Sequence, residues 1–450
     1  MVVEFLKDNV LFFLQKMLIC QIEKSSNANI DKIIDEINDT YEDIADIVLY
    51  QREDGAFSDY IVDGKSIFPT NGGICITNAC QLRCNYCSFS SDESKKTVDQ
   101  NDAKIFINFL VRNAILKRLI RNEEDCKIDL IITGGGEPTF RFNVFADIVN
   151  YVKDKCSAEK IPLFLNSTTN GIINKEQQKF ILNNFNFILV SFDGLPETQN
   201  KNRQSNTIKN SFTKVNDTLK FFNDNKMRFG IRTTIWPDDY SKIIDMVDFI
   251  YSEYPNAELW DIEPIIPRGR ALVYNSDICS SEKYLNTEFA HLYIEAKNYI
   301  KLHKDKDILS CSKFNGIVCG TLFGMHPWLL PSGDIVTCQD AKENAIRIGK
   351  IQNGSLSLQR FKDIYAEECF NNIVNCKDCF AFPFCLSGCP LKNLSDESTL
   401  VSIQECNMIK NYWKEIFITT LIKGNFLGWK ATEINNISAF YKIFRLEKEK

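Results

Sequence analysis

Six short apolar segments alternate with longer amphipathic stretches between residues 74 and 265. The segments are rich in β-branched and aromatic residues and cover 74–77, 128–133, 162–168, 187–192, 229–235 and 258–263. Stretches such as 102–120 and 208–223 place apolar residues at three- and four-residue steps, as helices do. This alternation predicts an α/β fold with a parallel sheet, either open or curled into a partial (β/α)6 barrel of the TIM type. Ligands of such sheets gather at the carboxyl ends of the strands.

Three cysteines follow the first of these segments with the spacing C-x3-C-x2-C, at Cys80, Cys84 and Cys87. Three thiolates can hold three irons of a [4Fe–4S] cube and leave the fourth iron without a protein ligand. Such an iron is open to chemistry, whereas a structural cluster normally has four protein ligands. The alternative is a zinc knuckle or a few buried thiols, although zinc sites usually pair cysteines as C-x2-4-C with a second pair nearby.

Two further features specify the chemistry. The aromatic Tyr86 precedes the last of these cysteines, and the second segment is followed by Gly134, Gly135, Gly136, Glu137 and Pro138. On these residues the chain resembles the radical S-adenosylmethionine (radical SAM) family, whose signature is C-x3-C-x-aromatic-C. The resemblance implies that the amino and carboxylate groups of SAM chelate the open iron. One electron then splits SAM into methionine and a 5′-deoxyadenosyl radical, which makes the three cysteines the expected catalytic residues.

Residues at and after the ends of the second, third and fourth segments, together with Tyr86, are the expected contacts of SAM. The set implied by the resemblance is Tyr86, Gly135, Gly136, Glu137, Asn170, Ser191, Asp193 and Arg203. Glu137 would receive the amino group of SAM, Ser191 and Asp193 the ribose, and Arg203 the methionine carboxylate through paired hydrogen bonds. Alternatively, Glu137 caps a strand-to-helix turn, and the Asn-Gly and Asp-Gly pairs are plain turns whose glycines supply a positive φ.

Arginines within the fifth segment and after the sixth have two interpretations. Arg232 and the run Arg268, Gly269 and Arg270 could face the backbone or the carboxylate of a substrate, because a Gly-Arg pair here is common in peptide-modifying relatives. A solvated basic loop is an equally good interpretation of the run.

A second array of cysteines occupies the C-terminal third of the chain. Its members are Cys319, Cys338, Cys376, Cys379, Cys385, Cys389 and Cys406, with Gly333 four residues before the second. Segment by segment this order resembles the SPASM extension of a subset of radical SAM enzymes. That resemblance implies two auxiliary [4Fe–4S] clusters, and thus three clusters in all. A zinc ribbon could mimic only the middle of the array.

The resemblance also implies crossed ligands for the two auxiliary clusters. The first cluster would be held by Cys319, Cys338 and Cys389, and the second by Cys376, Cys379, Cys385 and Cys406. Cys311 is the candidate for a fourth ligand of the first cluster. If it is not a ligand, that cluster keeps an open iron, which could bind a substrate thiolate.

The composition excludes several classes of protein. The net charge is −6 and no dense basic tract occurs, so we expect no nucleic-acid partner. Charged residues interrupt the apolar start of the chain, which argues against a signal peptide or a membrane span and favours the cytoplasm. In a reducing compartment, the 17 cysteines favour metal ligation over disulfides. The chain has 3 histidines, so histidine-based catalysis is not expected.

The motifs divide the chain into four parts. We expect a helical segment at 1–70, the partial barrel at 71–305, the SPASM domain at 306–410 and a helical extension at 411–450. The first part contains a predicted helix at 30–47 and a short hairpin at 57–67. It either covers the barrel or grips a leader peptide by strand addition.

These features predict an oxygen-sensitive radical SAM/SPASM enzyme that oxidatively modifies or crosslinks a ribosomally made peptide. The resemblance to the family implies that the substrate is a precursor peptide or protein and that the reductant is a flavodoxin or ferredoxin. The alternatives are a sulfatase-maturating enzyme that oxidises Cys or Ser to formylglycine, and a SPASM dehydrogenase acting on a small molecule. In the sulfatase-maturating group an aspartate close after the Gly-x4-Cys cysteine is the base. Here Gln339 follows Cys338, and Asp340 comes one position later.

Overall fold

The computed structural model describes part of the 450-residue chain. The described residues are 3–7, 10–13, 18–21, 69–89, 95–121, 126–265, 269–271, 287–314, 326–339, 347–358, 381 and 406–416. Several expected features lie outside these residues: the helix at 30–47, the hairpin at 57–67, Arg268, Cys319, Asp340, Cys376, Cys379, Cys385 and Cys389.

An 11-stranded sheet forms the main body, with β10 at one edge and β14 at the other. Its strands are β4 (Asn71–Cys75), β5 (Ile128–Thr133), β6 (Leu163–Thr169), β7 (Phe187–Ser191), β8 (Phe229–Ile235), β9 (Leu259–Pro264), β10 (Leu309–Ser310), β11 (Trp328–Leu329), β12 (Asp334–Val336), β13 (Arg347–Gln352) and β14 (Ser355–Leu358). Strands β4 to β10 are parallel neighbours in chain order. The expected α/β fold with a parallel sheet is therefore confirmed.

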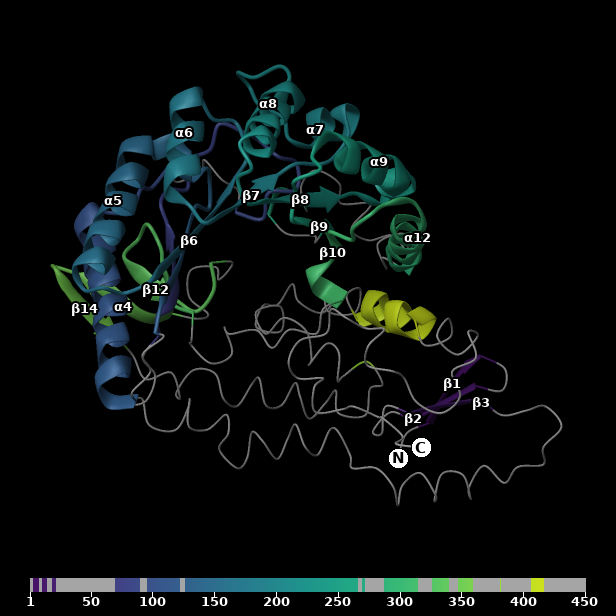
Figure 1. The fold of residues 1–450 in the computed structure, drawn as a ribbon, viewed down its shortest axis with the longest axis horizontal. Coiled ribbons are helices and arrows are strands. Elements are labelled where there is room, and N and C mark those ends of the chain that lie inside the picture. The colour runs from purple at the N-terminus through teal and green to yellow at the C-terminus, as the bar shows by residue number, and fades with distance from the viewer. Residues whose placement is uncertain are drawn as a thin grey trace.

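Helices connect the parallel strands and lie along the outer side of the curved sheet (Figure 1). They are α4 (Gln100–Arg121), α5 (Phe142–Ala158), α6 (Lys175–Asn184), α7 (Pro196–Asn202), α8 (Ser211–Asp224), α9 (Ile243–Glu253) and α12 (Thr287–His303), with short 3-10 turns η1 (Pro138–Arg141), η2 (Pro237–Lys242) and η4 (Ser312–Phe314). Among the described helices, none combines the length and the apolar character that a membrane crossing requires.

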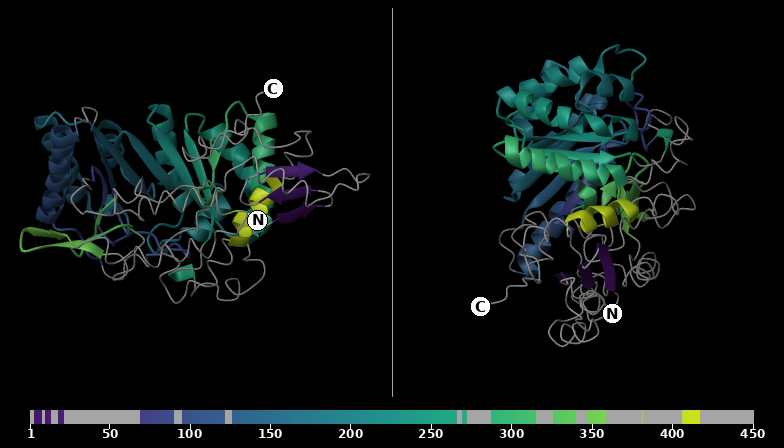
Figure 2. Two further views of the ribbon diagram at one scale, coloured as in Figure 1. Left: turned by 90° about the horizontal axis from the view of Figure 1, so that it is seen from below. Right: turned by 90° about the vertical axis from the view of Figure 1, so that its right-hand side faces the viewer.

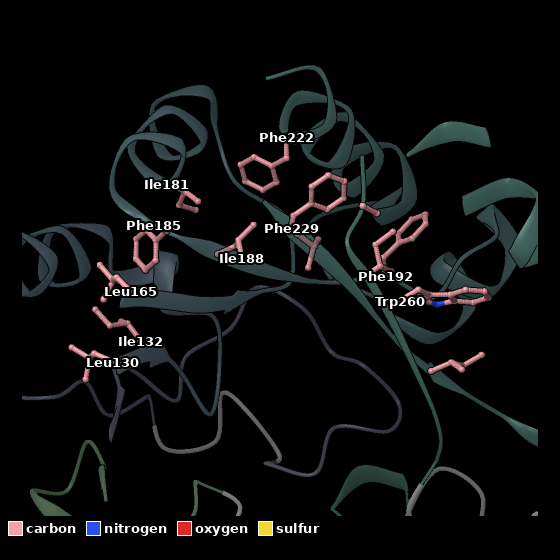
Figure 3. Close-up of a cluster of buried hydrophobic side chains, with 14 of the residues drawn as sticks. Leu130, Ile132, Leu165, Ile181, Phe185, Ile188, Phe192, Phe222, Phe229 and Trp260 are labelled. Carbon is pink, nitrogen blue, oxygen red and sulfur yellow. The ribbon is translucent and has the colours of Figure 1, made fainter. Parts of the chain in front are cut away.

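The core lies between the sheet and this layer of helices (Figure 3). Alternate residues of each strand point outward into it, for example Ile188 on β7 and Phe229 on β8, which are both fully buried. Aromatic rings fill the space beneath the helices: the rings of Phe145 on α5 and Phe185 stack with centroids 5.4 Å apart. The opposite row of each strand therefore remains for the inner face of the curved sheet.

Four short strands that the sequence did not predict extend the sheet beyond β4. β11 pairs parallel with β4, and β12, β13 and β14 follow in antiparallel order. They lie beside α4 at one end of the molecule (Figures 1 and 2). This part of the expected SPASM domain is thus hydrogen-bonded directly to the sheet that carries the first cysteine motif. The boundary at 305 stays a prediction.

The described residues near the two ends of the chain also form regular structure. β1 (Val3–Lys7), β2 (Val10–Phe13) and β3 (Leu18–Gln21) make a three-stranded antiparallel sheet, which the sequence did not predict. Residues 406–416 are helical. Tyr412 of this helix stacks on Phe314 with centroids 3.9 Å apart, and the buried Trp413 joins the main core.

Replacing Phe145 with alanine should destabilise the protein by about 3–5 kcal/mol, because truncating a fully buried ring leaves a cavity between α5 and the sheet. Leu302→Ala is the control: this side chain is 78% exposed on α12, and its loss should cost less than about 0.5 kcal/mol. Thermal unfolding of both variants measures the difference. Equal melting temperatures would contradict the assignment of the core.

Candidate active site

The cysteine loop and the glycine turn after β5 are joined by backbone hydrogen bonds. Gly136 N donates to Thr77 O over 2.9 Å, and Glu137 N donates to Ala79 O over 2.9 Å. A Cβ atom on Gly136 would overlap the carbonyl oxygen of Ala79. The sequence predicted a close approach of these glycines to a ligand. In the structure their nearest neighbour is the chain that leads into Cys80.

Glu137 connects the ends of β5 and β6. Its side chain is 1% exposed, and Oε1 accepts hydrogen bonds from Thr139 Oγ1 at 2.6 Å and from Thr169 Oγ1 at 2.9 Å. Oε2 accepts from Asn170 N at 2.7 Å. Burial raises the pKa of the Glu137 carboxyl, and these hydrogen bonds oppose the shift. Glu137 therefore caps the turn, as one of the two interpretations expected, and it also fixes the position of Asn170.

Asn170 leads from this carboxylate to the first cysteine. Its Nδ2 lies 3.6 Å from Cys80 Sγ, and its Oδ1 accepts a hydrogen bond from Gln81 Nε2 at 3.3 Å. The backbone N–H of Leu82 also points to Cys80 Sγ, at 3.4 Å. A thiolate at Cys80 would therefore have two donors beside it, which suits a metal-bound sulfur.

The three thiols are half-buried and lie close enough for their charges to interact. Burial raises the pKa of Cys80 to about 11 and that of Cys84 to about 12. In the described part of the chain, no three His, Cys, Asp or Glu side chains are grouped tightly enough to hold a single metal ion. A cube needs a wider arrangement, because each thiolate binds a different iron. The donor set and its spacing fit a cluster with three protein ligands.

Tyr86, Asp193 and Arg203 form one buried group beside the cysteine loop. Tyr86 Oη donates to Asp193 Oδ2 at 2.6 Å, and Arg203 Nε donates to Asp193 Oδ1 at 3.0 Å. Asp193 is 1% and Arg203 6% exposed. Burial opposes the charged guanidinium, but the surrounding groups, Asp193 first among them, together outweigh burial and raise the pKa of Arg203. Asp193, Arg203 and Tyr86 were each expected to contact SAM, and in the structure they are bonded to one another.

Two glycines beside these residues have left-handed backbone conformations. Gly171 has φ +76° and Gly194 has φ +81°, and each follows one of the polar residues expected to contact SAM. The turn interpretation of Asn170-Gly171 and Asp193-Gly194 is therefore confirmed for the glycines. The turn places the preceding side chain at the carboxyl end of its strand.

A row of polar residues crosses the inner face of the sheet. Ser191 pairs in register with Arg232, and Arg232 with Asp261. Arg232 Nη2 lies 2.8 Å from Glu263 Oε2, and Ser312 donates to the same carboxyl group. Arg232 therefore ties β8 to β9, and its side chain remains 41% exposed.

The other basic residue of interest lies near the cysteine loop. Arg270 N donates to Cys87 O at 3.1 Å, so the Gly-Arg pair packs its backbone against the last cysteine. The two interpretations of the arginine side chains, a substrate-facing group and a solvated loop, stay predictions.

Three of the cysteines expected at the auxiliary clusters are described. Cys311 is fully buried between β10 and η4, Cys338 is half-buried after β12, and Cys406 is exposed at the start of the helix 406–416. The other ligands expected for each cluster lie outside the described residues. The ligand sets of the auxiliary clusters therefore stay predictions.

Sequence reasoning missed the groups that hold the site residues in place. Thr139 and Thr169 fix Glu137, and Asn85 bridges to Asn202 and to Trp236. The ion pair could have been predicted from the sequence, because Asp193 and Arg203 lie on either side of the short helix α7 and carry opposite charges. The threonines carry no such signal, because their role depends on which strands become neighbours.

Gly136→Ala should destabilise the cysteine loop by about 1–3 kcal/mol and reduce the iron content, because the new methyl group collides with a backbone oxygen that is itself hydrogen-bonded. Gly135→Ala is the matched control. Its Cβ would lie 2.7 Å from Asn78 Oδ1, the far end of a side chain that can rotate away. Iron analysis and thermal unfolding of both variants test this difference, and equal losses would contradict it.

Comparisons with known proteins agree with this site. Residues 74–250 match the model of the Radical SAM superfamily. The cysteine-type anaerobic sulfatase-maturating enzyme of Clostridium novyi is 26% identical over 69% of this chain and 84% of its own. The solved structure "Native anSMEcpe with bound AdoMet" has a TM-score of 0.59 at 17% identity and covers 78% of this chain and 98% of its own. Streptococcus suis SuiB bound to precursor peptide SuiA has a TM-score of 0.50 at 15% identity, covering 87% and 99%.

At these identities the solved structures show the shared fold, and the family match covers the segment that carries the cysteine loop, the glycine turn and the buried ion pair. A radical SAM domain uses SAM and a [4Fe–4S] cluster, and the donor set at Cys80, Cys84 and Cys87 fits that cluster. The chain is therefore an enzyme with a radical SAM domain at residues 74–250, and it resembles the radical SAM peptide maturases.

Proposed function

We propose that this enzyme oxidatively modifies or crosslinks a ribosomally made peptide. The observation that carries the proposal is the cysteine loop, which is held at the carboxyl edge of a parallel sheet between the glycine turn and the β7 end. When bound, the cluster and SAM supply a radical that abstracts hydrogen from an unactivated carbon. A peptide substrate is supported by the resemblance to peptide maturases and by the likeness to SuiB, which was solved with a precursor peptide.

The residues of the chain divide the work in this proposal. Cys80, Cys84 and Cys87 hold the cluster. Gly135, Gly136, Glu137, Asn170 and Ser191 line the edge where SAM would bind, and Glu137 keeps Asn170 beside Cys80. The proposal also includes auxiliary iron–sulfur clusters in the C-terminal third of the chain. Their ligands would come from Cys311, Cys319, Cys338, Cys376, Cys379, Cys385, Cys389 and Cys406. These clusters would accept the electron that net oxidation of a substrate releases, while a flavodoxin or ferredoxin would supply the electron for SAM cleavage. Thiolate ligands of this kind persist in a reducing compartment, for which we propose the cytoplasm.

Formylglycine formation on a sulfatase is the second candidate. It is favoured by the relative from Clostridium novyi and by similar enzymes of Clostridium perfringens, one of which is 21% identical over 76% of this chain. The base of that reaction would have to come from the segment after Cys338. Asp340, the candidate by position, lies outside the described residues.

Anaerobically reconstituted wild-type protein should contain about twelve irons per chain, four for each of three clusters, and should release 5′-deoxyadenosine under reduction. A variant with Cys80, Cys84 and Cys87 all replaced by alanine should lose about four irons and all 5′-deoxyadenosine. Zinc in place of iron in the wild type, with no SAM cleavage, would refute the enzyme and leave a metal-stabilised scaffold.

Mass spectrometry of the products should separate the two candidates. A candidate precursor peptide encoded beside this gene should lose a pair of hydrogen atoms and gain a crosslink. A sulfatase-derived peptide with a target cysteine would also lose two hydrogen atoms, and in addition its sulfur would be replaced by the oxygen of an aldehyde. Conversion of the sulfatase peptide alone would favour the second candidate. The three-cysteine variant is the control for both reactions.

A further inference from the structure

The cysteine loop is attached to the chain after α7 along most of its length. Arg83 N donates to Gln204 O at 2.6 Å, and Asn85 N donates to Asn202 O at 3.0 Å. Ser205 Oγ also donates to Gln81 O, at 2.8 Å. These bonds hold the main chain on both sides of Cys84 without any contribution from a metal.

The group of Tyr86, Asp193 and Arg203 adds a side-chain connection at the same place. Asp193 accepts from Tyr86 and Arg203 through different oxygens, at 2.6 and 3.0 Å. The Arg203 guanidinium also lies over the Tyr86 ring, with its carbon 5.3 Å from the centroid. Each of the three side chains therefore contacts both others. These contacts fix the side chain of Tyr86, and with it the part of the loop between Cys84 and Cys87.

Arg203 is also an electrostatic neighbour of the cluster ligands. The Arg203 guanidinium lies over the ring of Tyr86, the residue that stands two positions after Cys84 and directly before Cys87. Asp193, which carries the opposite charge, is bonded to Arg203 through the oxygen that does not accept from Tyr86. A positive charge beside a cluster ligand stabilises the more negative, reduced cluster.

We propose that Tyr86, Asp193 and Arg203 form a lock that holds the cysteine loop and tunes the cluster, and that Asp193 and Arg203 are positioning residues rather than contacts of SAM. The inference rests on the proposed cluster at Cys80, Cys84 and Cys87. It reassigns two residues that the family resemblance had given to the ribose and the carboxylate of SAM. The reason is geometric, since both side chains are buried and bonded to each other at the cysteine loop.

Tyr86→Phe tests the mechanical part of the lock, because it removes only the hydroxyl group. In the reconstituted full-length protein without SAM, a chelator should extract the site iron roughly tenfold faster, as expected for the loss of one hydrogen bond to a charged group. Tyr254→Phe is the matched control: Tyr254 Oη donates to Asn216 Oδ1 at the same 2.6 Å, between α9 and α8. It should lower the melting temperature but leave the rate of iron release unchanged. The iron that the three-cysteine variant lacks identifies the site cluster.

Arg203→Gln tests the electrostatic part. The reduction potential of the cluster whose spectroscopic signal responds to added SAM should fall in the SAM-free enzyme, and Arg203→Lys should restore it. An unchanged potential together with weaker equilibrium binding of SAM would show that Arg203 binds the cofactor and would overturn the lock. Equal iron release from Tyr86→Phe and Tyr254→Phe would overturn it as well. Neither measurement needs turnover, so a wild type that forms no 5′-deoxyadenosine refutes only the proposed function.

Discussion

The contact of two backbone segments at the carboxyl edge of the sheet is the constraint on which the site depends. The glycine turn after β5 and the chain before Cys80 approach so closely that a single methyl group at Gly136 would separate them. Two hydrogen bonds at 2.9 Å hold them at this distance. Because β4 and β5 are parallel neighbours, their ends must leave the sheet at the same edge. The register of the sheet thus decides where the first cysteine lies.

A buried ion pair holds the other side of the loop. Burying Asp193 and Arg203 costs desolvation energy, and their mutual attraction offsets this cost only when the remaining hydrogen-bonding groups are also satisfied. Asp193 meets that condition through Tyr86, and the bond makes a cysteine-loop residue part of the ion pair. The hydrogen bond from Tyr86 to Asp193 therefore connects the end of β7 to the loop that carries Cys84 and Cys87.

The sequence predicted the parallel strands well because their apolar runs are bounded by glycine, proline and charged residues. Two of the six, 128–133 and 229–235, match β5 and β8 residue for residue. β11 was missed, because two paired residues leave no periodic pattern. The cysteine loop was recognisable from its spacing, whereas the link from Glu137 through Asn170 to Cys80 was not, since it depends on three segments meeting in space.

The residues that hold the cysteine loop and the polar residues of the inner face lie on different strands of the sheet. Residues on β4 to β7 hold the cysteine loop, and they lie within the segment that matches the Radical SAM superfamily. Arg232, Asp261 and Glu263 lie further along the sheet, on β8 and β9, and are bonded mainly to one another and to η4. Arg232 is the shared partner of both carboxyl groups, so it holds β8 and β9 together at this point of the inner face.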